Sequence, residues 1–144
     1  MNERITLKEC FVVLPMGNAH AGYEELHFER VYKKLIKPSI LAANYKPIRM
    51  DEVQSGTNGR LEVLSHLISM PVAIFDLSAK DGHVLTALGI RNSYHKVSLL
   101  LQDERTSKNF DTSKLEYIEY NHLLPEAYMK MIQDKIINRL LLFG

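Results

Sequence analysis

Short apolar runs alternate with amphipathic helical segments about five times along this chain, and this alternation constrains the fold more than any other feature. The clearest run, "PVAIFDL" at residues 71–77, is apolar at consecutive positions, as expected for a strand buried on both faces. Strands that are separated by helices pair in parallel, because each helical crossover returns the chain to the same end of the sheet. The pattern therefore predicts an α/β three-layer sandwich with a mostly parallel sheet.

The expected elements can be placed by their residue patterns. Right-handed crossovers between five strands favour a flavodoxin-like sheet order, 2-1-3-4-5. Pro38 lies inside the first helical segment and removes one backbone hydrogen bond, so we expect a kink or short break there. No repeat, low-complexity tract or linker interrupts the pattern, which predicts a single domain over residues 1–144. The expected strands are "CFVVLP", "YKPIRM", "PVAIFDL", "KVSLLLQ" and, as a last and exposed strand, "LEYIEY". The expected helices cover about 24–43, 60–69, 82–93 and 125 onward.

Composition excludes several classes of function. The 144 residues carry a net charge of only +1, and the nearest basic cluster, Lys33, Lys34 and Lys37, is typical of a solvated helix face. No nucleic-acid partner is expected, because such proteins usually present a wider basic surface. Cys10 is the single cysteine, so no disulfide within the chain is possible. The sequence has no signal-peptide pattern and no membrane span, which predicts a cytoplasmic protein without a membrane partner.

In a sheet of this order, ligands bind beyond the carboxyl ends of the strands, near the point where the strand order reverses. The loops that follow the first three strands are therefore the expected binding loops. A helix that starts near Gly82 would also direct its free amide groups at this crevice and favour an anion such as a phosphate. The candidate residues in these loops are Met16, Gly17, Asn18, Asp51, Glu52, Asp76, Ser78, Asp81, Gly82 and His83.

Each candidate also has a structural interpretation. Asp76 can cap the loop at the end of its strand, Asp51 and Glu52 can be solvated turn residues, and His83 can be an ordinary residue at a helix start. The histidines show no metal-ligand spacing, so no metal site is expected. No glycine-rich fingerprint for a phosphate or a dinucleotide is present.

The blocks "CFVVLPMG", "HFERVYKKLIKPSI", "YKPIRMDE", "VAIFDLS" and "HVLTALGIR" follow one another in a familiar order and spacing. In this the chain resembles the TIR-like, nucleoside 2-deoxyribosyltransferase-like superfamily. Within it, the chain is most similar to the bacterial branch related to the TRAFs-binding region of certain kinases. The resemblance covers roughly residues 10–101. It implies a domain that acts on the bond between ribose and base in NAD, a nucleoside or a nucleotide.

The resemblance also exposes a departure at Ala87. Members commonly read Asn-Pro-Asn-Val-aromatic-Tyr-Glu-Leu-Gly in the second block, and Ala87 falls on the catalytic glutamate. A carboxylate about 4 Å from a developing sugar cation is worth roughly 4 kcal/mol at an effective dielectric near 20, or about a thousandfold in rate. Ala87 is either natural, in a domain that binds without catalysis, or the result of replacing a glutamate. As written, the chain is expected to be nearly inactive.

Two hypotheses about function follow from the resemblance. The first is an N-glycosidase or transferase in which position 87 is catalytic, with Asp76 as the second catalytic candidate. Asp76 and Ser78 would contact the ribose. Met16 and Gly17, with the amides near Gly82 and His83, would then hold phosphate or base, while Asp51 and Glu52 line the opposite side. No cofactor is implied beyond NAD or a nucleotide as substrate, and the analogy suggests a homo-oligomer in stress or antiviral defence. The second hypothesis is a non-catalytic module that senses a nucleotide or associates with copies of itself.

Overall fold

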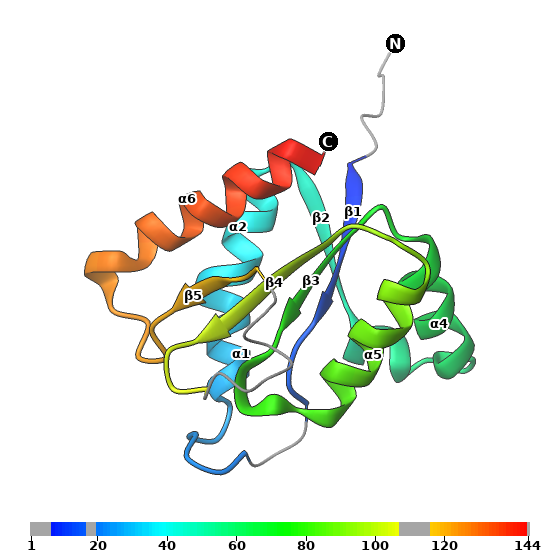
Figure 1. Cartoon of the computed structure of the whole chain (residues 1–144), viewed down its shortest axis with the longest axis horizontal. Helices are drawn as coiled ribbons and strands as arrows, with labels where there is room; N and C mark the ends of the chain where they lie inside the picture. Colours follow the sequence, from blue (N-terminus) through cyan, green and yellow to red (C-terminus); the bar gives the residue numbers. More distant parts are fainter. Residues whose placement is uncertain (1–6, 17–19, 107–115, 144) are drawn as a thin grey trace.

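The computed structural model describes residues 7–16, 20–106 and 116–143 of the chain (Figure 1). In these ranges five strands form one all-parallel sheet in the order β2-β1-β3-β4-β5. This confirms the predicted three-layer α/β fold and its flavodoxin-like strand order. The strands are β1 (Lys8–Val13), β2 (Tyr45–Arg49), β3 (Val72–Asp76), β4 (Ser98–Asp103) and β5 (Ile118–Tyr120).

Helices cover both faces of the sheet (Figure 1). One face carries α1 (His27–Val31), the π-helical turn η1 (Tyr32–Ile36), α2 (Lys37–Ala42) and α6 (Glu126–Phe143). The other face carries α3 (Met50–Gln54), α4 (Gly59–Ser69) and α5 (Gly82–Ser93). Neither α6 nor any other helix in the described ranges combines the length and apolar character needed to cross a membrane.

The core explains why the central strands are apolar at consecutive positions. In β1, Cys10 and Val12 face the layer of α1, α2 and α6, whereas Phe11 and Val13 face the layer of α4 and α5. All four side chains are almost fully buried. Because both faces of the strand are covered, alternate side chains need not be polar, and the strand appears in the sequence as an unbroken apolar run.

The break expected near Pro38 takes the form of a π-helical turn directly before it. The segment predicted as one helix is divided into α1, η1 and α2, and its helical part begins at His27 rather than Glu24. Pro38 has no amide hydrogen to donate to the carbonyl of Lys34. The side-chain amide of Gln133 on α6 donates to that carbonyl instead, at 2.9 Å. The group freed by the proline is therefore satisfied by the neighbouring helix.

Two short elements differ from their predictions. The polar segment after β2 was expected to be a loop, but residues Met50–Gln54 form α3. Five residues contain too few apolar positions for a helical period to be visible in a sequence. The last strand was expected to be exposed. β5 does lie at the sheet edge, yet its final residue, Tyr120, is only 3% exposed and reaches into the buried region at the ends of β3 and β4.

Candidate functional site

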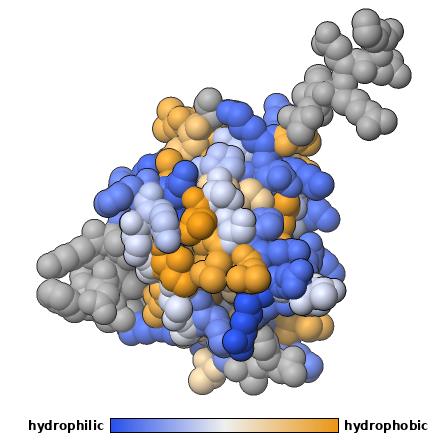
Figure 2. Space-filling model, turned by 90° about the vertical axis from the view of Figure 1, so that its right-hand side faces the viewer, coloured by the Kyte–Doolittle hydropathy of each residue, from blue (hydrophilic) through white to orange (hydrophobic). Residues whose placement is uncertain are grey.

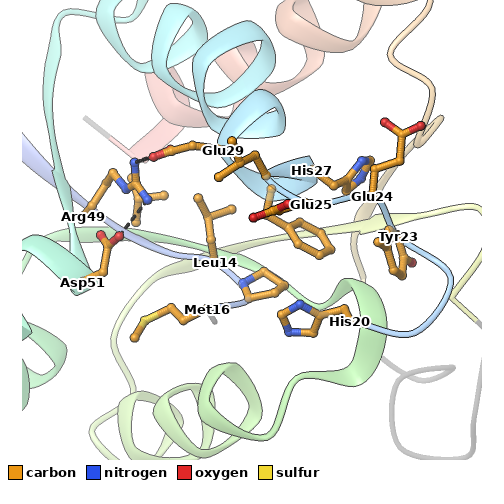
Figure 3. A pocket seen from close by; sticks show the side chains of 14 residues that line it. Leu14, Met16, His20, Tyr23, Glu24, Glu25, His27, Glu29, Arg49 and Asp51 are labelled. Carbon is orange, nitrogen blue, oxygen red and sulfur yellow. Dashed lines mark hydrogen bonds and ion pairs between the residues drawn. The ribbon is translucent and has the colours of Figure 1, made fainter. Parts of the chain in front are cut away.

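A pocket of about 250 Å³ opens at the carboxyl ends of β1 and β2, beneath the start of α1 (Figure 3). Its floor is the exit of β1, with Leu14 and Met16. One wall is the loop that leads into α1 together with the first turn of that helix, and the other is the end of β2. The position agrees with the general rule that ligands bind beyond the carboxyl ends of parallel strands.

The pocket lining is acidic. Arg49 is its central cation, and its guanidinium donates to both carboxylate oxygens of Glu29 at 2.8 Å and to Asp51 at 2.7 Å. Burial opposes the charge on Arg49, but the hydrogen bonds that Arg49 donates to Glu29 and the negative charge of Asp51 outweigh burial and raise the Arg49 pKa. One guanidinium cannot neutralise the whole lining. The four carboxylates that line the pocket are Glu24, Glu25, Glu29 and Asp51.

Glu25 differs from the other three carboxylates. Glu24 pairs with Arg30 at 2.9 Å, and Glu29 and Asp51 pair with Arg49. Within residues 7–16, 20–106 and 116–143, the Glu25 carboxylate has neither a hydrogen bond nor an ion pair. It lies over the pocket in Figure 3. A ligand with a hydroxyl or cationic group therefore finds one acceptor that none of the described residues occupies.

Aromatic rings form the remaining wall of the pocket. Phe28 packs edge-to-face against His20, with ring centroids 5.4 Å apart, and against His27 at 4.8 Å. Tyr23 lies 5.2 Å from Phe28. Such rings offer a surface on which a planar heterocycle can stack. The pocket thus combines carboxylates for hydroxyl groups with rings for a flat base.

Asp81 connects this pocket to the start of α5. Its carboxylate accepts hydrogen bonds from the amides of His83 at 2.9 Å and Val84 at 3.2 Å, and from the ring of His20 at 2.8 Å. Burial tends to raise the Asp81 pKa, but these three hydrogen bonds outweigh it and the net shift is downward. The His83 amide, which was expected to hold a phosphate or a base, therefore already has an acceptor within the protein.

Asp76 lies in a buried network at the ends of β3, β4 and β5. Its two oxygens accept hydrogen bonds from the Ser78 amide at 2.9 Å and from the Tyr120 hydroxyl at 2.6 Å. The Ser78 hydroxyl lies 3.1 Å from that of Tyr120 and accepts the amide of Asp103 at 2.9 Å. Burial is the main cause that raises the Asp76 pKa from 3.8 to about 6. This geometry matches the loop-capping interpretation of Asp76, and neither Asp76 nor Ser78 lines the pocket.

A second network holds the loop that carries the pocket's aromatic wall. The hydroxyl of Tyr23 donates to Asp103 at 2.7 Å, although the two residues are 80 positions apart. Thr106 donates to the same carboxylate and accepts the amide of Ala79 at 3.0 Å. Ala79 has φ 61°, a conformation that costs of order 1–3 kcal/mol for a residue with a side chain. The network compensates that cost and anchors Tyr23 against the sheet.

The described part of the chain offers neither a cluster of metal ligands nor a reactive thiol. No group of three or more His, Cys, Asp or Glu side chains there is placed to hold a metal ion. The Cys10 thiol lies inside β1, where burial raises its pKa to about 12. A thiol with that pKa stays protonated at neutral pH, so Cys10 is not a nucleophile in this fold.

The structure brings together only part of the predicted site. Met16 and Asp51 line the pocket, whereas Gly17 and Asn18 lie outside the described residues. Ala87 is 5% exposed and packs with Val84 and Leu88 in the core between α5 and the sheet. The remaining predicted residues do not line the pocket: Asp76 and Ser78 are buried in their network, Asp81 caps α5, and Glu52, Gly82 and His83 are exposed.

The prediction missed most of the side chains that give the pocket its chemistry. These side chains are His20, Tyr23, Glu24, Glu25, Phe28, Glu29 and Arg49. The signal that could have found several of them is the run "YEELHFER", in which acidic and aromatic residues follow the first strand's loop directly. This run was predicted only as the start of the first helix, because helical periodicity shows which residues share a helix face but not which other segments pack near them.

Comparisons with known proteins were made on the whole chain. No protein-family model and no curated protein matches it. Among solved structures, the constitutive lysine decarboxylase of E. coli superposes with a TM-score of 0.45 at 11% sequence identity, over 91% of this chain and 18% of that one. The present chain therefore spans less than a fifth of the decarboxylase chain. So distant a likeness carries no argument about function.

Proposed function

We propose that the pocket binds a nucleoside-type ligand, a ribose joined to a planar base, and that the chain as it stands does not cleave it. One observation carries this proposal: an acidic lining and an aromatic wall meet at the carboxyl ends of β1 and β2. Ribose hydroxyls can donate to carboxylates, and a base can stack on the rings. Among the described residues, none donates to the Glu25 carboxylate.

The net negative charge of the pocket lining restricts the class of ligand that can bind. Because Glu24 pairs with Arg30, three carboxylates remain against the guanidinium of Arg49, and this lining repels a phosphate, attracts a cation and tolerates a neutral group. A nucleoside, or the positively charged nicotinamide riboside portion of NAD, fits such a lining better than a nucleoside triphosphate does. The resemblance to the deoxyribosyltransferase-like superfamily suggests the same substrate class.

We propose binding without cleavage because of the state of the two positions predicted to be catalytic, Ala87 and Asp76. Cleavage of the bond between sugar and base needs a negative charge beside the sugar. Ala87 supplies a methyl group that is packed in the core. Asp76, the other residue predicted to be catalytic, is fully buried, and Ser78 and Tyr120 donate to its carboxylate oxygens. Neither residue offers a free carboxylate to a ligand in the pocket.

The test measures binding and base release together. A nucleoside or NAD at 100 times its dissociation constant should stabilise the chain by about 2.7 kcal/mol, seen as a thermal shift. Glu25→Gln should weaken that binding by tenfold or more, because a hydrogen bond to a charged acceptor is worth roughly 1.5–3 kcal/mol. Mass spectrometry of the same mixtures should find no free base with the unchanged chain.

Controls separate the possible outcomes. Glu119→Gln removes an exposed carboxylate from β5, outside the pocket lining, and should leave binding unchanged. Free base released only by Ala87→Glu would support the interpretation of position 87 as a lost catalytic residue. Base released by the unchanged chain and abolished by Glu25→Gln would instead make Glu25 the catalytic group. No thermal shift with any nucleoside or with NAD would refute the proposal.

Exposed apolar side chains on the side of the sheet opposite α6 support a second candidate function, self-association. Figure 2 shows apolar side chains gathered on the side of the molecule that carries α4 and α5. Leu61 and Leu64 on α4 are 70% and 43% exposed, and Leu85 on α5 is 37% exposed. Exposed apolar patches commonly mark contacts between proteins.

Light scattering after gel filtration tests this candidate. If α4 and α5 form the contact, the chain at tens of micromolar elutes as a dimer and Leu61→Glu elutes as a monomer, because the contact would have to bury an unpaired carboxylate. Leu142→Glu is the matched control, since Leu142 is 79% exposed on α6, across the sheet. A monomer at every concentration would exclude self-association of this chain.

A further inference from the structure

A second hollow, of about 460 Å³, adjoins the acidic pocket and shares Tyr23, Glu24 and His27 with it. Three segments that are distant in the sequence form its walls: the start of the first helical layer, the loop after β4 and the loop after β5. We call it the basic hollow. Its polar side chains besides Tyr23 are Glu24, His27, Arg30, Lys34, Arg105 and His122.

The basic hollow carries an excess of positive charge. Three permanent cations, Arg30, Lys34 and Arg105, line it against the single carboxylate of Glu24. Glu24 pairs with Arg30 at 2.9 Å. In the part of the chain that the structure describes, Lys34 and Arg105 have no acidic partner. Two uncompensated cations therefore face one cavity, the reverse of the acidic pocket beside it.

A buried nitrogen without a partner lies in the wall of the same hollow. His27 is only 5% exposed, and among the described residues its Nε2 has no hydrogen-bond partner. Burial, followed by the charge of Arg30, lowers the His27 pKa, so the ring is neutral at pH 7. An unsatisfied buried polar atom destabilises the folded state, because it has lost its hydrogen bonds to water. A ligand oxygen that reaches this nitrogen would remove the cost.

Contacts with Gly22 and Tyr23 hold Arg105 at the basic hollow. The Gly22 carbonyl accepts a hydrogen bond from the Arg105 guanidinium, which also stacks 5.0 Å from the centre of the Tyr23 ring. A Cβ atom at residue 22 would stand 2.8 Å from that guanidinium, and the φ of +86° there already favours glycine. The guanidinium is therefore fixed in place before any ligand arrives, which lowers the entropy cost of binding.

We propose that the basic hollow is a binding site for a small molecule with a phosphate ester, distinct from the nucleoside pocket. The excess of cations from separate segments suits a dianionic phosphate better than a singly charged carboxylate. A volume of about 460 Å³ exceeds what inorganic phosphate needs, and Leu123 and Leu124 supply an apolar surface for the organic part of the molecule. The proposal is independent of the nucleoside pocket, because Arg30, Lys34 and Arg105 do not line that pocket.

Titration calorimetry at low salt tests the proposal with inorganic phosphate, phenyl phosphate and acetate as probes. Both phosphates should bind saturably, phenyl phosphate more tightly because of the leucines. Lys34→Gln should raise the dissociation constant about fivefold, the effect of losing one partly exposed ion pair. Glu24→Gln should lower it by a similar factor of about five, because it frees Arg30 and removes the opposing charge.

The matched control is Lys37→Gln. Lys37 is an exposed lysine at the start of α2, which follows the η1 turn that carries Lys34. It does not line the hollow. It should leave phosphate binding nearly unchanged. Equal weakening by Lys34→Gln and Lys37→Gln would mean diffuse surface charge and would overturn the site. Acetate binding as tight as that of phosphate, or no saturable binding of either phosphate, would overturn it as well.

Discussion

Replacing Arg91 with methionine should lower the free energy of unfolding by about 4 kcal/mol, because it leaves several buried carbonyl groups without donors. Arg91 is completely buried in α5. Its guanidinium donates to the carbonyls of Leu67 at 2.9 Å and Met70 at 2.9 Å at the end of α4, and to the carbonyl of Val97 before β4. One side chain thus joins two helices and a strand.

Arg91→Met is expected to destabilise the fold because the groups that accept hydrogen bonds from Arg91 are backbone carbonyls. Replacing both members of a buried ion pair with apolar residues can be neutral, because both charges leave together. Here the acceptors are backbone groups, which remain after the substitution and lose their donors. Methionine keeps much of the side-chain length, so the loss reports hydrogen bonding more than a cavity.

Urea unfolding followed by circular dichroism measures the change, which should also lower the melting temperature by about 15 °C. Arg60→Met is the matched control, since Arg60 is exposed in the first turn of α4. It should change stability by less than about 0.5 kcal/mol. A loss below about 1 kcal/mol for Arg91→Met would show that the carbonyls find other donors, such as water.

The second large effect concerns the pH dependence of stability and Asp76. Burial raises the Asp76 pKa from 3.8 to about 6 in the folded chain, so the folded state binds a proton that the unfolded state has released. This contribution is fully present below about pH 4 and is lost as the pH rises to about 6. The difference of about two units corresponds to roughly 3 kcal/mol.

Asp76→Asn removes this titration and keeps an oxygen that can accept from Ser78 or Tyr120. The stability of the variant relative to the unchanged chain should therefore rise by about 3 kcal/mol between pH 4 and pH 7. Urea unfolding at four pH values measures it. Asp134→Asn, an exposed carboxylate on α6, controls for the loss of one negative charge. If the Asp76→Asn curve runs parallel to that of the unchanged chain, Asp76 does not hold its proton.

The fold could be predicted because its signals are local. Apolar runs and helical spacing are properties of five to fifteen neighbouring residues, and they identified every strand of the sheet and its longer helices. The short helix α3 was missed because five residues carry no visible period. The π-helical turn before Pro38 could be expected only as a break, since its form depends on α6, from which Gln133 reaches the free carbonyl.

The candidate site was predicted less well than the fold. The rule about the carboxyl ends of strands led to the end of the sheet at which the pocket opens, and Met16 and Asp51 line that pocket. The same rule could not tell a lining carboxylate from a buried one. Asp76 is the last residue of β3 and Asp51 lies just beyond the end of β2, yet only Asp76 is enclosed, by Ser78 and Tyr120. Tyr120, which donates to it, is 44 residues away in the sequence.

The amino-acid sequence by itself determined the parallel sheet and its strand order. Only the tertiary structure decided which charged groups stay free. Arg49 pairs with Glu29 and Asp51 but not with Glu25, and Asp81 accepts the amide of His83. Lys34 and Arg105 converge on the basic hollow beside His27. The physical reason is that burial follows local periodicity, whereas the balance of charge in a pocket depends on side chains that folding brings together from up to about 80 residues apart.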